Sequence, residues 1–257
     1  MKNLLSLEFR RLLRAKSFYI CLAIAMIMIL ISAATNKMLL NIASSEEFGE
    51  AFGAVIQAPT SISMLKSTAS SSLTVILAIF LSIFVTEDYA SDTIKNVYAK
   101  GFSREEVFFA KYVSTLAATF VFFAVCSLFS FAMGKAIFGE IGKAGENLVP
   151  SLFAILLTVF AYATIYFTVA VCIKKTGAAI AISIIGPIVL TLLLSLGNAA
   201  INSEKINLTD YWLDGRLSIL QQANVAGKEL LIGFVVSGVA LLAAGAIGFF
   251  INRASEK

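Results

Sequence analysis

Histidine is absent from this 257-residue chain, and only 14% of its residues are charged. Without histidine the chain can form no Ser/His or Cys/His nucleophile pair, and no His-x-x-x-His zinc site of the kind that membrane proteases use. A Gly-x-x-x-x-Gly-Lys-Ser/Thr motif is missing too, because the nearest string, Gly139 to Lys143, has the wrong spacing. We therefore expect no metal site, no catalytic site and no bound cofactor in this chain.

Acidic residues are missing from the long apolar runs of the sequence. This excludes an intramembrane aspartyl protease and a proton relay of buried carboxylates, since such groups would have to lie inside the bilayer. Cysteine is scarce, and Cys21, Cys126 and Cys172 show neither pairing nor metal-ligand spacing, so we interpret them as buried small hydrophobes. Basic residues do not cluster with aromatic ones, so no nucleic-acid partner is expected.

What the chain has in abundance is apolar surface, because 59% of its residues are hydrophobic. Soluble domains contain about 45–50% apolar residues, so this composition indicates a membrane protein. Six non-alternating runs are near or above the ~20 residues that a helix needs to cross ~30 Å of hydrocarbon. The predicted fold is therefore an all-α polytopic membrane protein. The six predicted spans are residues 18–39, 68–86, 112–134, 148–173, 176–198 and 230–252.

The basic residues indicate the orientation of these spans. Thirteen of the 20 lie in the two terminal segments, in residues 87–111 and in the Lys174–Lys175 turn, whereas seven lie in the other connections. Because cytoplasmic loops carry an excess of Lys and Arg, we expect both termini on the cytoplasmic side. The outer loops are then residues 40–67, 135–147 and 199–229. The last of these contains Tyr211 and Trp212 and is interpreted as short helices at the outer interface.

Residues 1–17 have the pattern of a basic amphipathic helix lying in the membrane surface. One face carries apolar residues that include Phe9 and Leu13, and the opposite face carries Arg10, Arg11 and Arg14. A signal peptide is the competing interpretation, since a basic start precedes an apolar run. Seventeen amphipathic residues before the apolar run are too many for the short charged n-region of a signal peptide, so we favour the surface helix and expect it to contact lipid.

Residues 87–111 form the longest charged segment and contain the signals for two capped helices. Ile94, Val97 and Tyr98 share one face of a first helix, expected over residues 88–100. Gly101 stands where a left-handed residue would end that helix. Ser103 and Glu106 have the spacing of a capping box that starts a second helix, which Phe102 and Val107 support as a hydrophobic staple. We interpret this corner as a rigid docking element, and a solvated connecting loop is the alternative.

Some polar features remain within the predicted spans. Thr158, Tyr162 and Tyr166 recur every four residues on one face of the fourth span. They either form hydrogen bonds between helices or line a route for an amphiphilic substrate. Pro187 in the fifth span frees the carbonyl of Ser183, which predicts a kink. These five residues are the candidate substrate path.

The segment 87–111 resembles the cytoplasmic loop of ABC-2-type permeases, also called type V ABC transporters. The matching elements are Glu87-Asp88, Thr93-Ile94-Lys95, Gly101-Phe102-Ser103-Arg104 and Ala110-Lys111, with Asp92 where the family usually has glycine. The basic N-terminal helix, six spans and a helical outer loop before the last span extend the resemblance over nearly the whole chain. In size and layout the chain is similar to subunits for bacteriocin or lantibiotic immunity, antimicrobial-peptide resistance, or peptide and drug efflux.

This resemblance implies a transport subunit in the bacterial plasma membrane, without its own ATPase. A separate cytoplasmic ABC ATPase would bind ATP and Mg²⁺, and a second permease, identical or related, would complete a dimer. The exported substrate would be amphiphilic: a peptide, an antibiotic or a lipid-like molecule. A self-contained channel or secondary carrier and a non-transporting assembly factor are the alternatives. The implied ATPase-docking residues are Glu87, Asp88, Tyr89, Thr93, Ile94, Lys95, Val97, Tyr98, Gly101, Phe102, Ser103 and Arg104.

Overall fold

The six apolar runs form six long helices, as predicted. A computed structural model describes residues 2–43, 59–91, 93–142, 145, 147–201, 207–222 and 224–254, and in these ranges the regular structure is helical throughout. Each of the six is long and apolar enough to cross a membrane. They are α2 (Lys16–Ala43), α5 (Ser71–Ala90), α7 (Arg104–Phe138), α8 (Leu148–Ile173), α9 (Thr176–Ile201) and α11 (Gly227–Ala254).

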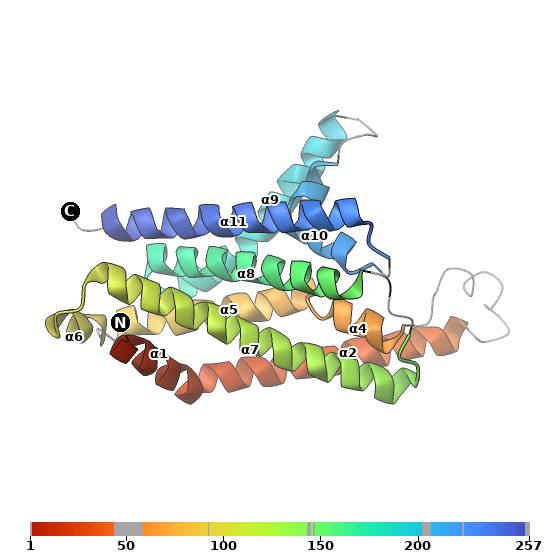
Figure 1. The fold of residues 1–257 in the computed structure, drawn as a ribbon, viewed down its shortest axis with the longest axis horizontal. Helices are drawn as coiled ribbons and strands as arrows, with labels where there is room; N and C mark the ends of the chain where they lie inside the picture. The colour runs from red at the N-terminus through yellow and green to blue at the C-terminus, as the bar shows by residue number, and fades with distance from the viewer. Residues whose placement is uncertain are drawn as a thin grey trace.

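Shorter helices lie at the two ends of this bundle. At one end are α1 (Lys2–Arg14) and α6 (Thr93–Ala99), close to both ends of the chain (Figure 1). At the other end are α4 (Ser61–Ser67), the 3-10 helix η1 (Leu208–Tyr211) and α10 (Leu213–Leu220). The two ends are called the α6 end and the α10 end below.

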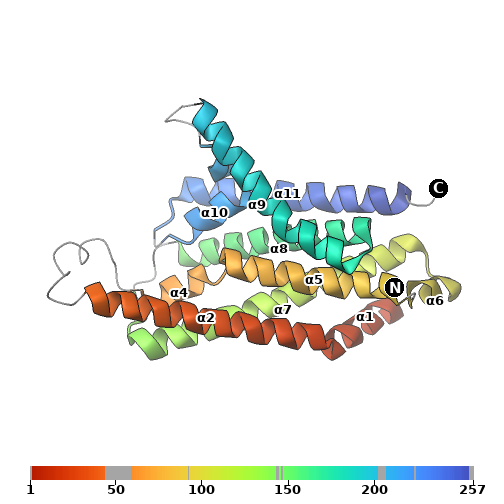
Figure 2. The ribbon, with the colours of Figure 1, turned by 180° about the vertical axis from the view of Figure 1, so that it is seen from behind.

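Helices α5 and α8 form the interior of the bundle. Side chains such as Phe80, Leu81, Ile155 and Phe167 are completely buried there, with α8 packed against α5, α7, α9 and α11. By contrast, most of α9 is exposed, and Figure 2 shows it bending away from the other spans. Pro187 lies inside this helix, in agreement with the predicted kink, because its ring removes one backbone donor. The exposed apolar faces are those that lipid covers in a membrane protein.

Close packing of α8 and α11 depends on Gly248. A Cβ atom at this position would lie 2.8 Å from the Thr168 hydroxyl oxygen, which itself donates a hydrogen bond of 2.9 Å to the carbonyl of Ala244. Small residues therefore bring these two helices together within one chain. Two of the cysteines, Cys21 and Cys126, are buried as expected, but Cys172 is exposed on the surface of the bundle.

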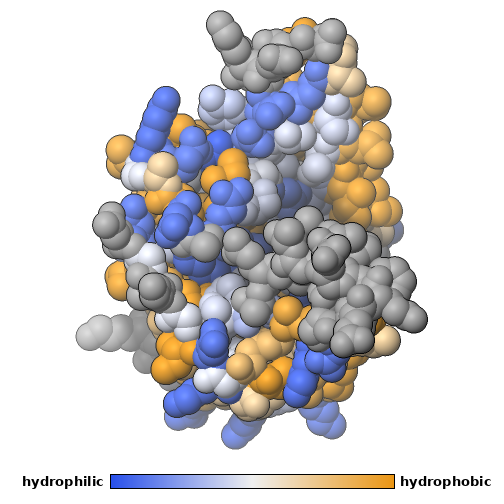
Figure 3. Space-filling model, turned by 90° about the vertical axis from the view of Figure 1, so that its right-hand side faces the viewer, coloured by the Kyte–Doolittle hydropathy of each residue, from blue (hydrophilic) through white to orange (hydrophobic). Residues whose placement is uncertain are grey.

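The α10 end contains short helices, η1 and α10, as predicted for residues 199–229. Tyr211 is exposed, and α10 packs against α8 and α11 with Leu213, Leu217 and Leu220 buried. The reason is their spacing, which puts all three on one face of a short helix that can bury itself only against the bundle. Hydrophilic residues spread over this end of the molecule, whereas hydrophobic residues gather at one flank (Figure 3). Residues 44–58 of the loop 40–67 lie outside the described residues.

Candidate functional site

The corner before α7 has the local structure that its sequence predicts. Gly101 is in the left-handed region with φ of +87°, and its N–H donates to the carbonyl of Tyr98 at 2.9 Å. The Ser103 hydroxyl accepts from the Glu106 N–H at 3.2 Å, and the Glu106 carboxylate accepts from the Ser103 N–H at 3.1 Å. The predicted left-handed glycine and capping box are therefore confirmed.

The helix before this corner is shorter than predicted. The expected helix over residues 88–100 is divided, because α5 continues to Ala90 and α6 begins at Thr93. Ser91 separates the two: its hydroxyl donates to the Glu87 carbonyl at 2.8 Å and lies 2.6 Å from the Thr93 hydroxyl. Serine side chains that bond to the backbone in this way compete with the continuing helix. Glu87, Asp88 and Tyr89 therefore belong to the last turn of α5.

One face of α6 attaches it to the bundle. Ile94 is 8% exposed and packs with Leu4 of α1 and with Val107 and Ala110 of α7; Val97, Tyr98 and Phe102 border this cluster. Part of the apolar face of α6 is therefore covered within the chain, and the docking role of the corner stays a prediction. The exposed part of the corner consists of Thr93, Ala99, Lys100, Gly101, Ser103 and Arg104. The side chain of Lys95 lies outside the described residues.

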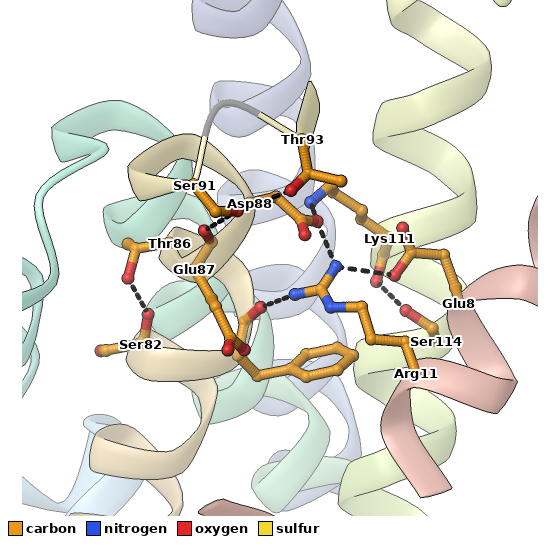
Figure 4. Close-up of polar contacts among 11 residues, drawn as sticks. Glu8, Arg11, Ser82, Thr86, Glu87, Asp88, Ser91, Thr93, Lys111 and Ser114 are labelled. Atoms are coloured by element: carbon orange, nitrogen blue, oxygen red, sulfur yellow. Dashed lines mark hydrogen bonds and ion pairs between the residues drawn. The ribbon is translucent and has the colours of Figure 1, made fainter. Parts of the chain in front are cut away.

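Beneath α6 lies a cluster of four charged side chains from three helices (Figure 4). Asp88 of α5 accepts from both Arg11 of α1 and Lys111 of α7, and Arg11 lies 3.3 Å from Glu8. The Arg11 guanidinium also donates to the Phe84 carbonyl and covers the Phe84 ring at 4.7 Å from its centroid. Two acids and two bases balance in charge, so the cluster can stay ionised although Lys111 is only 4% exposed. We call Glu8, Arg11, Asp88 and Lys111 the charge cluster.

The charge cluster changes the interpretation of α1. Arg10 and Arg14 are exposed as expected, and Arg11 lines the same surface hollow but is only partly exposed, because its guanidinium bonds to Asp88. Phe9 and Leu13 are exposed on the outside of the helix, where lipid can cover them. Burial raises the pKa of Glu8 above its ordinary value, although Lys111 and Arg11 oppose this shift. The amphipathic pattern correctly predicted helix α1, but it could not reveal the ion pair between Arg11 and Asp88.

A second site lies between the spans near the α10 end. It is a cavity of about 470 Å³, with lining residues on α5, α8, α9 and α10. The Tyr162 hydroxyl donates to Asp214 Oδ1 at 2.5 Å, and the Thr191 hydroxyl lies 2.9 Å from Asp214 Oδ2. The rings of Tyr162 and Tyr166 stack with their centroids 5.8 Å apart. We call this space the α8–α10 cavity.

Four of the five residues of the candidate substrate path line this cavity, and the fifth contributes to packing between helices. Tyr162, Tyr166, Ser183 and Pro187 line the cavity. Thr158 does not, because its hydroxyl is bonded within the bundle, 2.8 Å from the Ser237 hydroxyl of α11 and 2.8 Å from the Ala154 carbonyl. Of the two interpretations left open by the sequence, helix packing therefore holds for Thr158.

Comparison with protein families resolves which class of membrane protein this is. The family model described as "ABC-2 family transporter protein" matches residues 4–198 of the chain. The chain belongs to this ABC-2 family. Comparison with curated proteins and with solved structures returned no match. The protein is accordingly a multi-pass permease of an ABC transporter, a membrane component that lacks the ATPase and that associates with one.

Within this ABC-2 permease, several residues at the two sites were not found from the sequence. Glu8 and Lys111 were not assigned to the charge cluster, and Thr191 and Asp214 were not assigned to the α8–α10 cavity. A usable signal existed for Lys111 and Asp88, because each stands where an apolar run meets the same end of the bundle. For Asp214 the signal was its place beside Leu213, Leu217 and Leu220, whose spacing puts them on one face of a short helix. Among the described residues, no group of three His, Cys, Asp or Glu side chains could hold a metal ion.

Proposed function

We propose that this ABC-2 permease forms the membrane path of an exporter in the bacterial plasma membrane, with both termini and α6 on the cytoplasmic side. The excess of Lys and Arg in the segments at the α6 end supports this orientation. A separate cytoplasmic ATPase binds ATP and Mg²⁺, because this chain lacks a P-loop. Closure of two such ATPase subunits then moves the spans between an inward-open and an outward-open arrangement.

The observation that carries this proposal is the rigid connection between α6 and the span α7. Helix α7 runs without interruption from Arg104 to Phe138, and only three residues separate the end of α6 at Ala99 from the capping residue Ser103. Ile94 attaches α6 to both α1 and α7, and the charge cluster ties α1 and α7 to α5. A displacement applied to α6 therefore reaches three helices of the bundle without passing through a loose loop.

A second permease, identical or related, completes the transport unit in this proposal. Helix α9 presents Ile185, Ile188, Leu192 and Leu196 on its exposed surface, each more than half exposed. In a membrane such a face is covered either by lipid or by another helix. A facing copy of the permease would place the α8–α10 cavity next to the dimer interface, because α9 lines that cavity.

The substrate route is proposed to include the α8–α10 cavity. Its volume falls in the range of about 300–1,000 Å³ that is usual for small-ligand sites. Its lining combines aromatic rings and aliphatic side chains with a few hydroxyls. Such a lining suits a molecule with an apolar body and a polar group, which agrees with an amphiphilic peptide, antibiotic or lipid-like substrate.

Affinity purification from the native membrane tests the ATPase association. We expect the tagged permease to retain a stoichiometric ATPase, and the exposed pair Ala99–Lys100 to be part of the contact. The variant A99E/K100E should lose the ATPase because it adds negative charge to the outer surface of the corner. The matched control is A136E/K135E, which changes an exposed Lys–Ala pair near the other end of α7 and should keep the ATPase. Equal retention by both variants would contradict docking at α6.

A further inference from the structure

The charged side chain that lines the α8–α10 cavity is acidic. Asp214 is its acidic lining residue, and no Lys or Arg lines it within the part of the chain that is described. The nearest base along the chain, Arg216, is 3% exposed and already engaged, because it donates to Glu229 at 2.6 Å and to the Asp210 carbonyl. The negative charge of the carboxylate is therefore not balanced by a base in the cavity wall.

Asp214 also has acceptor positions that the described residues leave open. An ionised carboxylate offers about four such positions. Among the described residues Tyr162 fills one, and Thr191 fills at most one more. The single hydroxyl proton of Thr191 is shared between Asp214 and the Pro187 carbonyl, both at 2.9 Å. A ligand that donates hydrogen bonds can therefore reach the carboxylate without displacing Tyr162.

Next to this carboxylate stand two aromatic rings. Tyr162 and Tyr166 are 1% and 2% exposed, and their stacked rings are inclined by 29° to each other. An ammonium or guanidinium group is attracted to the face of such a ring from distances of up to ~6 Å. Ile184 and Ile188 of α9 supply apolar wall on the opposite helix. Carboxylate, rings and aliphatic wall together match a cation attached to an apolar body.

We infer that the α8–α10 cavity binds an amphiphilic cation, with Asp214 as its anionic anchor. The group in contact with Asp214 is a primary ammonium or a guanidinium, which can both donate hydrogen bonds and lie against Tyr162 or Tyr166. This inference names the substrate class at the route described above and rests on the proposed function for its role in transport. Binding itself requires neither the ATPase nor a second permease.

The position of Asp214 is set by its immediate neighbours. A Cβ atom on Gly215 would lie 2.0 Å from the Thr209 carbonyl oxygen, so only glycine allows η1 to pass this close to α10. Arg216 then connects the same helix to Glu229 at the start of α11. These contacts hold the carboxylate against α8 and α9, which favours a preformed anchor over a mobile one.

The chain carries its own probe for this binding. Trp212 is its single tryptophan and lies two residues before Asp214. The purified permease in phosphatidylcholine vesicles is titrated with decylammonium, while the emission of Trp212 is followed. We expect a saturable change with decylammonium and a much weaker one with decanol or decanoate, which share its alkyl chain but lack the positive charge. Equal responses to decylammonium and decanol would overturn the inference, and this comparison needs no variant.

Variants of Asp214 sharpen the test. D214N should raise the apparent Kd for decylammonium about tenfold or more, because a charge-assisted contact is lost, whereas D214E should keep most of the affinity. The matched control D210N removes the same charge from η1, outside the cavity lining, and should leave the Kd unchanged. Unchanged binding by folded D214N would show that the carboxylate serves only to bond Tyr162 and Thr191. Loss of the ATPase in affinity purification, with cation binding intact, would instead count against the proposed function alone.

Discussion

Lys111 of α7 and Asp88 of α5 form an ion pair in the interior of the α6 end, although they are 23 positions apart in the chain and α6 lies between them. Asp88 also accepts from Arg11 of α1, so one carboxylate joins three helices. The exposed residues of α6 and the buried charge cluster are thus parts of one unit. A surface helix that receives force needs such an attachment to the spans that it moves.

The first prediction concerns removal of Lys111. K111M should lower the free energy of unfolding by about 3 kcal/mol, because it leaves two buried carboxylates opposite one base. Unfolding titrations of the purified protein in mixed micelles measure this loss. The exposed Lys135 supplies the control K135M, which should change the free energy of unfolding by less than about 0.5 kcal/mol. The double variant D88N/K111M should recover part of the loss; a double variant less stable than K111M would contradict the ion-pair account.

The second prediction follows from the raised pKa of Glu8. Its ordinary value is 4.5, and burial shifts the folded-state pKa upward. The folded state therefore disfavours the ionised form, and this cost is absent below the unfolded-state pKa and complete above the folded-state pKa. E8Q should have nearly the wild-type melting temperature at pH ~4 and gain stability relative to wild type as the pH approaches ~7. The control E105Q changes an exposed site, so its difference in melting temperature from wild type should stay constant over this pH range. The same constant difference for E8Q would contradict the prediction.

The third prediction tests the packing of α8 against α11. G248A should cost about 1–3 kcal/mol of stability, because the added methyl group meets the Thr168 hydroxyl at 2.8 Å. Gly238 lies in the same helix, and no atom from a neighbouring element would lie within 4 Å of a Cβ atom there, so G238A should be neutral or stabilise by up to about 1 kcal/mol. Thermal unfolding of both variants gives the comparison. Equal behaviour of the two would mean that the close approach at Gly248 contributes nothing.

The fourth prediction concerns the left-handed turn at Gly101. Its Cβ position is unobstructed, so G101A acts only through the positive φ, at a cost of about 1 kcal/mol. We expect faster amide hydrogen exchange in α6 and in the first turn of α7, with the far end of α7 unchanged. G177A, in an open position in the first turn of α9, is the control. Unchanged exchange around the corner in G101A would show that this turn is held by tertiary contacts instead.

Local features of this permease could be predicted because their determinants lie within a few residues of one another. The six spans follow from long apolar runs in a medium where backbone groups must be bonded within the helix. Gly101, Ser103 and Glu106 specify the corner through i to i+3 contacts, and the structure has the left-handed glycine and the capping box that they predict. The predicted length of α6 was wrong because the hydrogen bond from the Ser91 hydroxyl to the Glu87 carbonyl competes with the continuing helix.

The tertiary structure alone decided which side chains meet. The spans are apolar on all faces, so no periodicity indicates which face turns toward which neighbour. The sequence therefore showed Thr158 and Tyr162 as one stripe, whereas packing turned Thr158 toward Ser237 and Tyr162 toward Asp214. The charge cluster likewise depends on the ends of α1, α5 and α7 arriving together. Residue spacing determines a helix, but long-range partners are determined by how the helices pack, and both candidate sites are made of such partners.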